Sequence, residues 1–170
     1  MPAEQHIKVW DLLVRSVHWG LATLIVIELL NEAGANPWHR YLGYLAAALV
    51  VVRLAWGCGE RGHSSLVSMV ASARRAPSYF TQGSAGSIGH TPPGALMAFA
   101  LWTLVLLVAL TGWMLGLDAF WGEEWLQQIH EVLAYVLAVF AVVHILAAIV
   151  SSYAQRVNLI KSMITGNKPA

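Results

Sequence analysis

Four long apolar stretches dominate the chain and lie roughly at residues 12–30, 39–57, 95–117 and 129–152. Each contains about the 20 mostly apolar residues that an α-helix needs to cross a bilayer. The charged and polar residues concentrate between these stretches and at the two ends. The pattern predicts an all-α membrane protein, a four-transmembrane-helix bundle in which residues 1–170 form a single integral-membrane domain.

The composition agrees with this prediction, with 58% hydrophobic and only 11% charged residues among 170. A soluble domain has roughly 45–50% apolar and about 25% charged residues. Asp11 and Arg15 directly precede or enter the first apolar stretch, which is unlike a cleaved signal peptide. Cys58 is the only cysteine, so an internal disulfide, a Cys-based iron–sulfur cluster and a covalent Cys-x-x-Cys-His haem site are all excluded.

The basic residues are distributed unevenly between the two sides of the predicted bundle. Nine of the ten fall on one side, namely Lys8, Arg15, Arg53, Arg61, Arg74, Arg75, Arg156, Lys161 and Lys168. Only Arg40 falls on the other, where the connections are acidic. By the positive-inside rule both termini are expected to be cytoplasmic. The chain is predicted to be surrounded by membrane lipid. It lacks a basic stripe of the kind that would indicate nucleic-acid binding.

One long connection, residues 58–94, contains the segment "SSLVSMVASARRAPSYF". This segment is equally typical of a short helix on the inner membrane surface and of a loop folded over the helix ends. Tryptophans near the ends of the predicted spans are expected in the interfacial aromatic belt; they are Trp38, Trp56, Trp121 and Trp125.

Histidines begin and end the core of the last apolar stretch, "HEVLAYVLAVFAVVH". His144 follows His130 by fourteen residues. On an α-helix this spacing is a rotation only about 40° short of four full turns and a rise of about 21 Å. The two side chains therefore project from nearly one face, one near each side of the membrane. Ionisable groups at such positions usually face the bundle interior and have a function.

Two further histidines lie at the same predicted depths in the membrane as His144 and His130. His18 is close to the inner end of the first span and His39 opens the second span at the outer side. Two imidazoles on facing helices at one depth supply the axial ligands of a haem iron, whereas zinc or copper would need three or four converging ligands. The spacing predicts two non-covalent haems, with the ligand pairs His18/His144 and His39/His130.

Three arginines are candidates for binding the haem propionates. Arg53 lies fourteen residues after His39, so it shares that helical face but sits at the inner depth, where a propionate would neutralise it. Arg40 is placed to bind an outer propionate or to extend into the head groups. Arg15, one turn before His18, is a weaker inner candidate for the same reason.

Two other ionisable residues leave alternatives open. His90 precedes the third span and either contacts an inner propionate or quinone or belongs to an ordinary loop. Glu131 follows His130 directly and either tunes the outer haem or is simply an interfacial carboxylate.

Four motifs together resemble the bacterial cytochrome b561 family, which also includes cytochrome b subunits of nickel-iron hydrogenases: "VWDLLVRSVHWGL", "WHRYLGYLAAALVVVRLAWG", "GHTPPGALMAFALWTLVLLVALTGWM" and "HEVLAYVLAVFAVVH". The resemblance implies a four-helix bundle with two b-type haems that exchanges electrons with the membrane quinone pool. It assigns the ligands to His18, His39, His130 and His144 and the late arginine of the second span to Arg53. Hydrogenase subunits are usually longer by one span, so the shorter b561 type is the better match.

Three hypotheses about function follow. With histidine in both axial positions, the iron has no open site and transfers electrons only. The first hypothesis is a carrier in the bacterial inner membrane between quinone and a periplasmic c-type cytochrome or redox enzyme. The second is a stand-alone oxidoreductase that takes electrons from a small donor such as superoxide. The third is a haemless bundle that transports a metal ion or holds a complex together.

Overall fold

Four long helices form the body of the protein in the computed structural model, which describes residues 6–31, 37–60, 62, 65–82 and 91–169. All four are long and apolar enough to cross a membrane. They are α1 (Leu12–Leu30), α2 (Pro37–Gly59), α5 (Pro92–Met114) and α6 (Glu124–Gln155). The predicted all-α bundle of four spanning helices is therefore confirmed.

Capping residues set the ends of these helices. Asp11 caps α1, its Oδ1 accepting from the backbone N–H of Val14 at 2.8 Å. Thr91 caps α5, and the helix begins at Pro92, three residues earlier than the apolar pattern indicated, because proline is tolerated in a first turn. α6 has 32 residues, about 48 Å of helix, so it extends beyond a hydrocarbon core about 30 Å thick.

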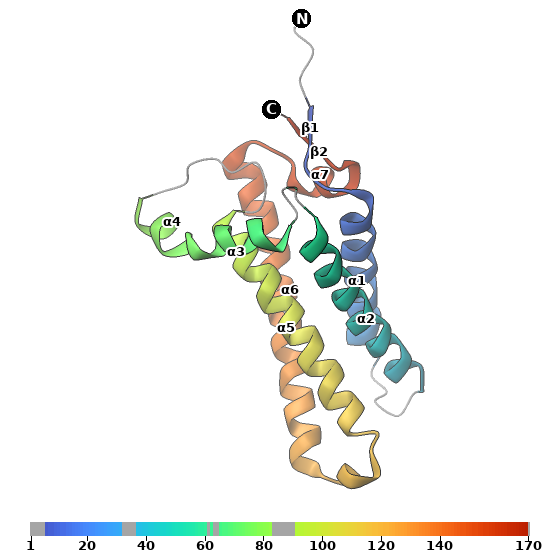
Figure 1. The fold of residues 1–170 in the computed structure, drawn as a ribbon. Coiled ribbons are helices and arrows are strands. Elements are labelled where there is room, and N and C mark those ends of the chain that lie inside the picture. The colour runs from blue at the N-terminus through green and yellow to red at the C-terminus, as the bar shows by residue number, and fades with distance from the viewer. Residues whose placement is uncertain (1–5, 32–36, 61, 63–64, 83–90, 170) are drawn as a thin grey trace, which may run out of the picture.

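The spanning helices form two antiparallel pairs, α1 with α2 and α5 with α6 (Figure 1). Packing of α2 against α5 joins the pairs. α6 packs along α5 and, at its end, against α7 (Leu159–Thr165), but makes no comparable contact with α1 or α2 in the part of the chain described. One side of α6 thus faces the first pair of helices across a separation.

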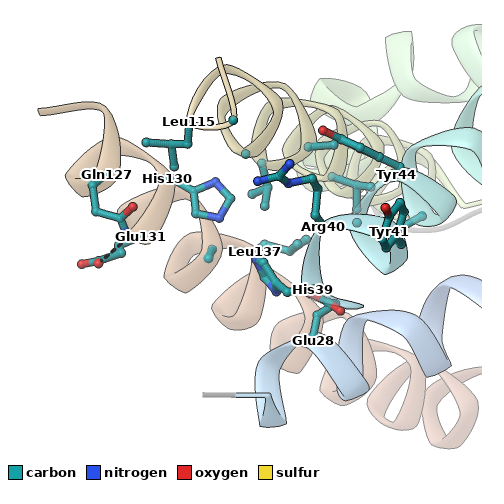
Figure 2. Close-up of a pocket in the computed structure, with 18 of the residues that line it drawn as sticks. Glu28, His39, Arg40, Tyr41, Tyr44, Leu115, Gln127, His130, Glu131 and Leu137 are labelled. Atoms are coloured by element: carbon teal, nitrogen blue, oxygen red, sulfur yellow. Dashed lines mark hydrogen bonds and ion pairs between the residues drawn. The ribbon is translucent and has the colours of Figure 1, made fainter. Parts of the chain in front are cut away.

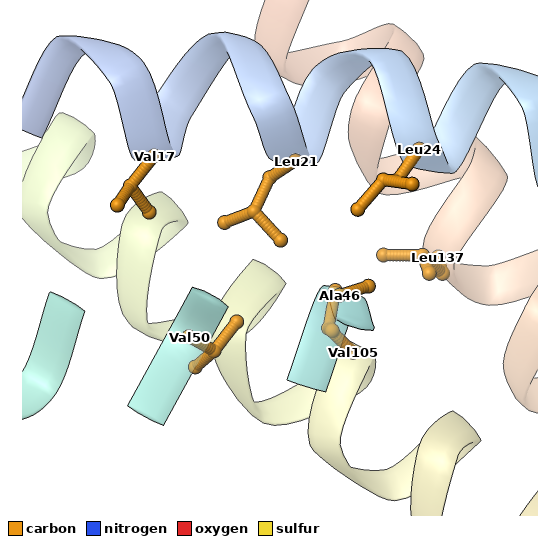
Figure 3. Packing of buried hydrophobic residues seen from close by; sticks show 7 residues of the cluster. All are labelled: Val17, Leu21, Leu24, Ala46, Val50, Val105 and Leu137. Carbon is orange, nitrogen blue, oxygen red and sulfur yellow. The ribbon is translucent and has the colours of Figure 1, made fainter. Parts of the chain in front are cut away.

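A small apolar core joins the two pairs near mid-depth (Figure 3). Its buried members are Val17, Leu21, Leu24, Ala46, Val50, Val105 and Leu137. Leu137 is the contribution of α6 and is 7% exposed. It lies seven residues from both His130 and His144, about 10 Å along the helix from each, so the core separates the depths of the two histidine pairs.

A two-stranded antiparallel sheet, which the hydrophobic pattern did not predict, lies at one end of the bundle. Strand β1 (His6–Lys8) pairs antiparallel with β2 (Asn167–Pro169), so these two strands lie together at one end of the bundle (Figure 1). Gly166 caps the C-terminal end of α7 with a φ of 85°, a conformation that suits glycine. The carbonyl oxygen of Gly166 accepts from the N–H groups of Val9 and Trp10. Lys168 lies over the Trp10 ring, and burial lowers the pKa of its ammonium group.

The long inner connection folds into two short helices, α3 (Leu66–Arg74) and α4 (Ala76–Gln82). Ser65 caps α3 by accepting from the N–H of Ser68 at 3.2 Å. α3 packs against α5 and α2, with Met69 fully buried and Val67 exposed. The segment is therefore helical, as one interpretation expected, and the loop of the other interpretation was wrong. Its position on the inner membrane surface stays a prediction.

The outer end is formed by the connection between α5 and α6, which includes a 3-10 turn, η1 (Asp118–Phe120). The acidic side chains of this end are exposed. Four tryptophans near the ends of the spanning helices have exposed side chains, as an aromatic belt would require; they are Trp38, Trp56, Trp121 and Trp125.

Candidate functional site

Two histidines face each other near the outer end of the bundle. The ring centroids of His39, on α2, and His130, on α6, are 6.1 Å apart, with ring planes 85° from parallel. A ring nitrogen lies about 1.1 Å from its centroid and binds a metal at about 2.0 Å, so one metal ion between facing imidazoles needs centroids about 6.2 Å apart. The outer pair therefore has the spacing for one shared metal ion.

A second pair faces across the inner half of the bundle. The rings of His18, on α1, and His144, on α6, have centroids 6.2 Å apart. Nδ1 of His18 is buried, and the described part of the chain offers it no hydrogen-bond partner. The structure thus brings together the two pairs that helix depth predicts, and both bridge the separation between α6 and the first pair of helices. Ligation itself stays a prediction.

A cavity of about 1030 Å³ surrounds the outer pair. Its polar lining includes Glu28, His39, Arg40, His130 and Glu131, and Figure 2 shows these side chains coming from α1, α2 and α6. Ligand pockets are commonly between about 300 and 1,000 Å³, so the volume is sufficient for a large cofactor.

Hydrogen bonds determine which ring nitrogen of His130 is available. Thr111 Oγ1 lies 2.9 Å from His130 Nδ1 and 3.0 Å from the carbonyl oxygens of both Leu107 and Val108. A hydroxyl has a single hydrogen, which here is donated to a carbonyl of its own helix. Thr111 therefore accepts from Nδ1–H of His130, and the lone pair of Nε2 remains for a metal.

His39 has an acidic partner at the corresponding nitrogen. Its Nδ1 pairs with Oε2 of Glu28, on α1; Figure 2 shows Glu28 beside the ring. A carboxylate on the second nitrogen is the arrangement that holds many metal-binding histidines. The sequence interpretation assigned no role to Glu28 or Thr111, although a polar residue in an apolar stretch was a usable signal.

Gly112 lets α5 approach the outer pair closely. A Cβ atom at this position would lie 3.1 Å from Cε1 and 3.7 Å from Nδ1 of His130. A Cβ atom there would require the imidazole to move by a few tenths of an ångström. The pair "TG" at 111–112 thus contacts His130 through a hydroxyl and through a close backbone approach, and the sequence interpretation assigned it no role.

The three candidate arginines have different surroundings. Arg40 lines the outer cavity, and its guanidinium lies against Gly116. Arg15 instead donates from Nη1 to the carbonyl oxygen of Ile164, near the end of α7, where a cation is favoured by the helix dipole. Binding of propionates by either arginine stays a prediction.

Arg53 is 3% exposed, although it carries a charge. Its guanidinium lies 5.3 Å from the ring centroid of Trp102 and its Nη2 lies 3.5 Å from Sδ of Met69, so α3 and α5 cover it. The charges of Glu60 and Asp11 also act on it. The two carboxylates partly neutralise the charge of Arg53 without any propionate. The propionate contact that the sequence suggested stays a prediction.

The remaining candidates divide into exposed and undescribed residues. Glu131 is exposed and accepts from Nε2 of Gln127 at 2.9 Å, which supports the interfacial alternative. His90 lies outside the described residues. Within the described ranges, no group of three or more His, Cys, Asp or Glu side chains gathers where it could hold a metal ion.

Comparison with known families decides the class of this protein. The family model for prokaryotic cytochrome b561 matches residues 9–166, nearly the whole chain. The chain belongs to the prokaryotic cytochrome b561 family. No curated protein and no solved structure matches it significantly.

Membership of the cytochrome b561 family makes this protein a transmembrane b-type cytochrome of electron transfer, and implies that it binds haem b. Together with the four apolar helices it indicates a multi-pass bacterial membrane protein. The resemblance seen in the four motifs is confirmed. Haem binding by the family supports the two cytochrome hypotheses over the haemless bundle.

Proposed function

We propose that this cytochrome binds two non-covalent b haems, one between His39 and His130 and one between His18 and His144. The observation that carries the proposal is the pair of centroid separations, 6.1 and 6.2 Å, each matching one shared iron. The cavity of about 1030 Å³ around the outer pair supports it, because this volume is sufficient for a flat cofactor at that site. Bound haem supplies a one-electron ferric/ferrous couple at an iron with both axial positions taken.

The arginines bind the propionates in this proposal. Arg40 projects into the outer cavity and is assigned to the outer haem. Arg53 is assigned to the inner haem because it is buried at the inner depth, and Arg15 is a second inner contact beside His18. Charge-assisted hydrogen bonds to carboxylates are stronger than neutral ones, so these residues orient as well as neutralise the cofactor.

The proposed role is electron transfer across the bacterial inner membrane, between the quinone pool and a periplasmic redox partner. The two sites are about 21 Å apart along α6, which connects the two membrane surfaces. Exposed carboxylates at the outer end, on Asp118, Glu123 and Glu124, suit a c-type cytochrome or redox enzyme with a basic face. At the inner end, a cavity of about 410 Å³ lined by Ala73, Arg74, Ala76, Pro77 and Leu96 is the proposed quinone site.

A second candidate function is direct oxidation of a small donor such as superoxide, with quinone as acceptor. The observation that favours it is the 31% exposure of the His39 side chain, through which a small molecule can approach the outer site. Stopped-flow mixing distinguishes the two. Rapid reduction of the purified cytochrome by the small donor alone supports the second candidate, and reduction only with a protein partner supports the first.

Haem content of single variants tests the ligand assignment. We expect a dithionite-reduced minus air-oxidised spectrum with b-type bands and a pyridine haemochrome value near two haems per chain. His18→Ala and His39→Ala should each lower the value to about one, since each removes one of the two axial ligands of one iron. His6→Ala, at a histidine in strand β1 and outside the four spanning helices, is the matched control and should retain both haems. A wild-type protein with a single haem, or histidine variants that keep two, would contradict the assignment.

A further inference from the structure

The two histidine pairs differ in the partners of their Nδ1 nitrogens. At the outer pair, Nδ1 of His39 is in ion-pair contact with the carboxylate of Glu28, and Nδ1 of His130 is hydrogen-bonded to the hydroxyl of Thr111. At the inner pair, Nδ1 of His18 is buried without a hydrogen-bond partner in the described part of the chain. The difference lies outside the ligand sets, which are identical.

Such a difference changes the electron density on a bound iron. An imidazole that donates its Nδ1–H to a carboxylate becomes a stronger electron donor through Nε2. A stronger donor stabilises the ferric state over the ferrous state, so it lowers the reduction potential; hydrogen bonding around the ligands is one of the means by which proteins set haem potentials.

Resting on the two-haem proposal above, we propose that Glu28 and Thr111 are positioning residues that fix the tautomers of His39 and His130 and lower the outer reduction potential below the inner one. Glu28 has the larger effect because it is acidic, whereas Thr111 offers a neutral oxygen. The inner pair, with His18 lacking such a partner, keeps the higher potential.

The arginines act in the same direction overall. Arg53 is buried, so its positive charge is weakly screened and favours the reduced state of the inner site. Arg40 would raise the outer potential, but it is exposed to a solvent that screens its charge. An electron shared between the two sites is therefore more stable at the inner one, and transfer from the outer side inward is downhill.

Redox titration of the full-length, haem-loaded cytochrome in lipid nanodiscs tests the proposal. We expect two one-electron waves in the wild type, of which His39→Ala removes the lower. Glu28→Gln should move that lower wave upward by about a tenfold change in the ferric/ferrous ratio at fixed potential, about 59 mV for one electron, and leave the upper wave in place. Asp118→Asn is the control, because it removes an exposed carboxylate at the same end of the bundle that does not line the outer cavity; its lower wave should move far less.

Thr111→Val provides an independent variant if Glu28→Gln fails to retain the outer haem. It removes the acceptor for His130 with little change of shape, and should raise the same wave by a smaller amount. A lower wave that moves equally in Glu28→Gln and Asp118→Asn, or that belongs to the inner haem, overturns the proposal while leaving the two-haem assignment intact. Absence of two haems in the wild type would instead overturn the assignment.

Discussion

The outer and inner histidine pairs have nearly the same ring separation, 6.1 against 6.2 Å, and very different surroundings. The outer pair lies in a large cavity with an acid, a hydroxyl and an exposed arginine around it. The inner pair lies in the half of the bundle that contains buried Arg53, and His18 has a buried nitrogen with no partner in the described chain. Helix spacing sets the distance available to an iron, whereas individual polar side chains distinguish the chemistry of the two sites.

The largest expected effect is on the outer pair alone. Gly112→Ala would place a Cβ atom 3.1 Å from Cε1 of His130, so the imidazole must move by a few tenths of an ångström from a position where Thr111 and the proposed iron both constrain it. We expect the haem content to fall from two to about one per chain, with the inner spectrum retained.

Gly59→Ala is the control for this prediction, because a Cβ atom there meets nothing within 4 Å. The pyridine haemochrome assay should find its haem content unchanged. An intact outer haem in Gly112→Ala would show that α5 can move away from His130, and would remove the close approach from the account of this site.

The next largest effect concerns the boundary between the two sites. Leu137 is 7% exposed and is the α6 member of the core between the pairs. Leu137→Ala leaves a cavity, for which the cost in soluble cores is about 2–5 kcal/mol, and should lower the thermal stability of both haem sites together. Val139→Ala, at a side chain that is 59% exposed on the same helix, should change little. Thermal release of haem followed by absorbance distinguishes a joint loss from loss at one site.

The smallest effect is a shift of potential at the inner pair. Arg53→Gln removes a buried positive charge from the inner half of the bundle, so the ferrous state there is stabilised less and the upper redox wave should move downward, by up to about 59 mV for a tenfold change in ratio. Arg75→Gln removes an exposed charge from the same end and should have little effect, because solvent screens it. If both variants leave the upper wave in place, Arg53 does not affect the inner haem, and its role is to pack against Met69 of α3.

Some features of this protein were readable because they depend on local chemistry. Long apolar runs predict spanning helices in any tertiary arrangement, since backbone groups in lipid must be hydrogen-bonded within the segment. The fourteen-residue spacing of His130 and His144 places both on nearly one helical face. Positions along the four spans were then sufficient to match His18 with His144 and His39 with His130.

Other features depend on contacts between distant segments. Arg15 was considered as a propionate partner, but the structure also pairs it with Ile164, 149 residues away. The two-stranded sheet of β1 and β2 pairs segments from opposite ends of the chain, and short strands carry too weak a local signal to be predicted. α3 was ambiguous in the sequence because its apolar face is small, and burial of Met69 against Arg53 is what gives that face a partner.

The sequence by itself determined the number of spanning helices, their order and the depth of each histidine, because hydrophobic length and helical rise are properties of single segments. Only the tertiary structure decided which polar groups reach the second ring nitrogens, where glycine admits a neighbouring helix, and that α6 faces α1 and α2 across a separation. These depend on how helices distant in sequence approach one another, which is set by packing summed over the whole bundle.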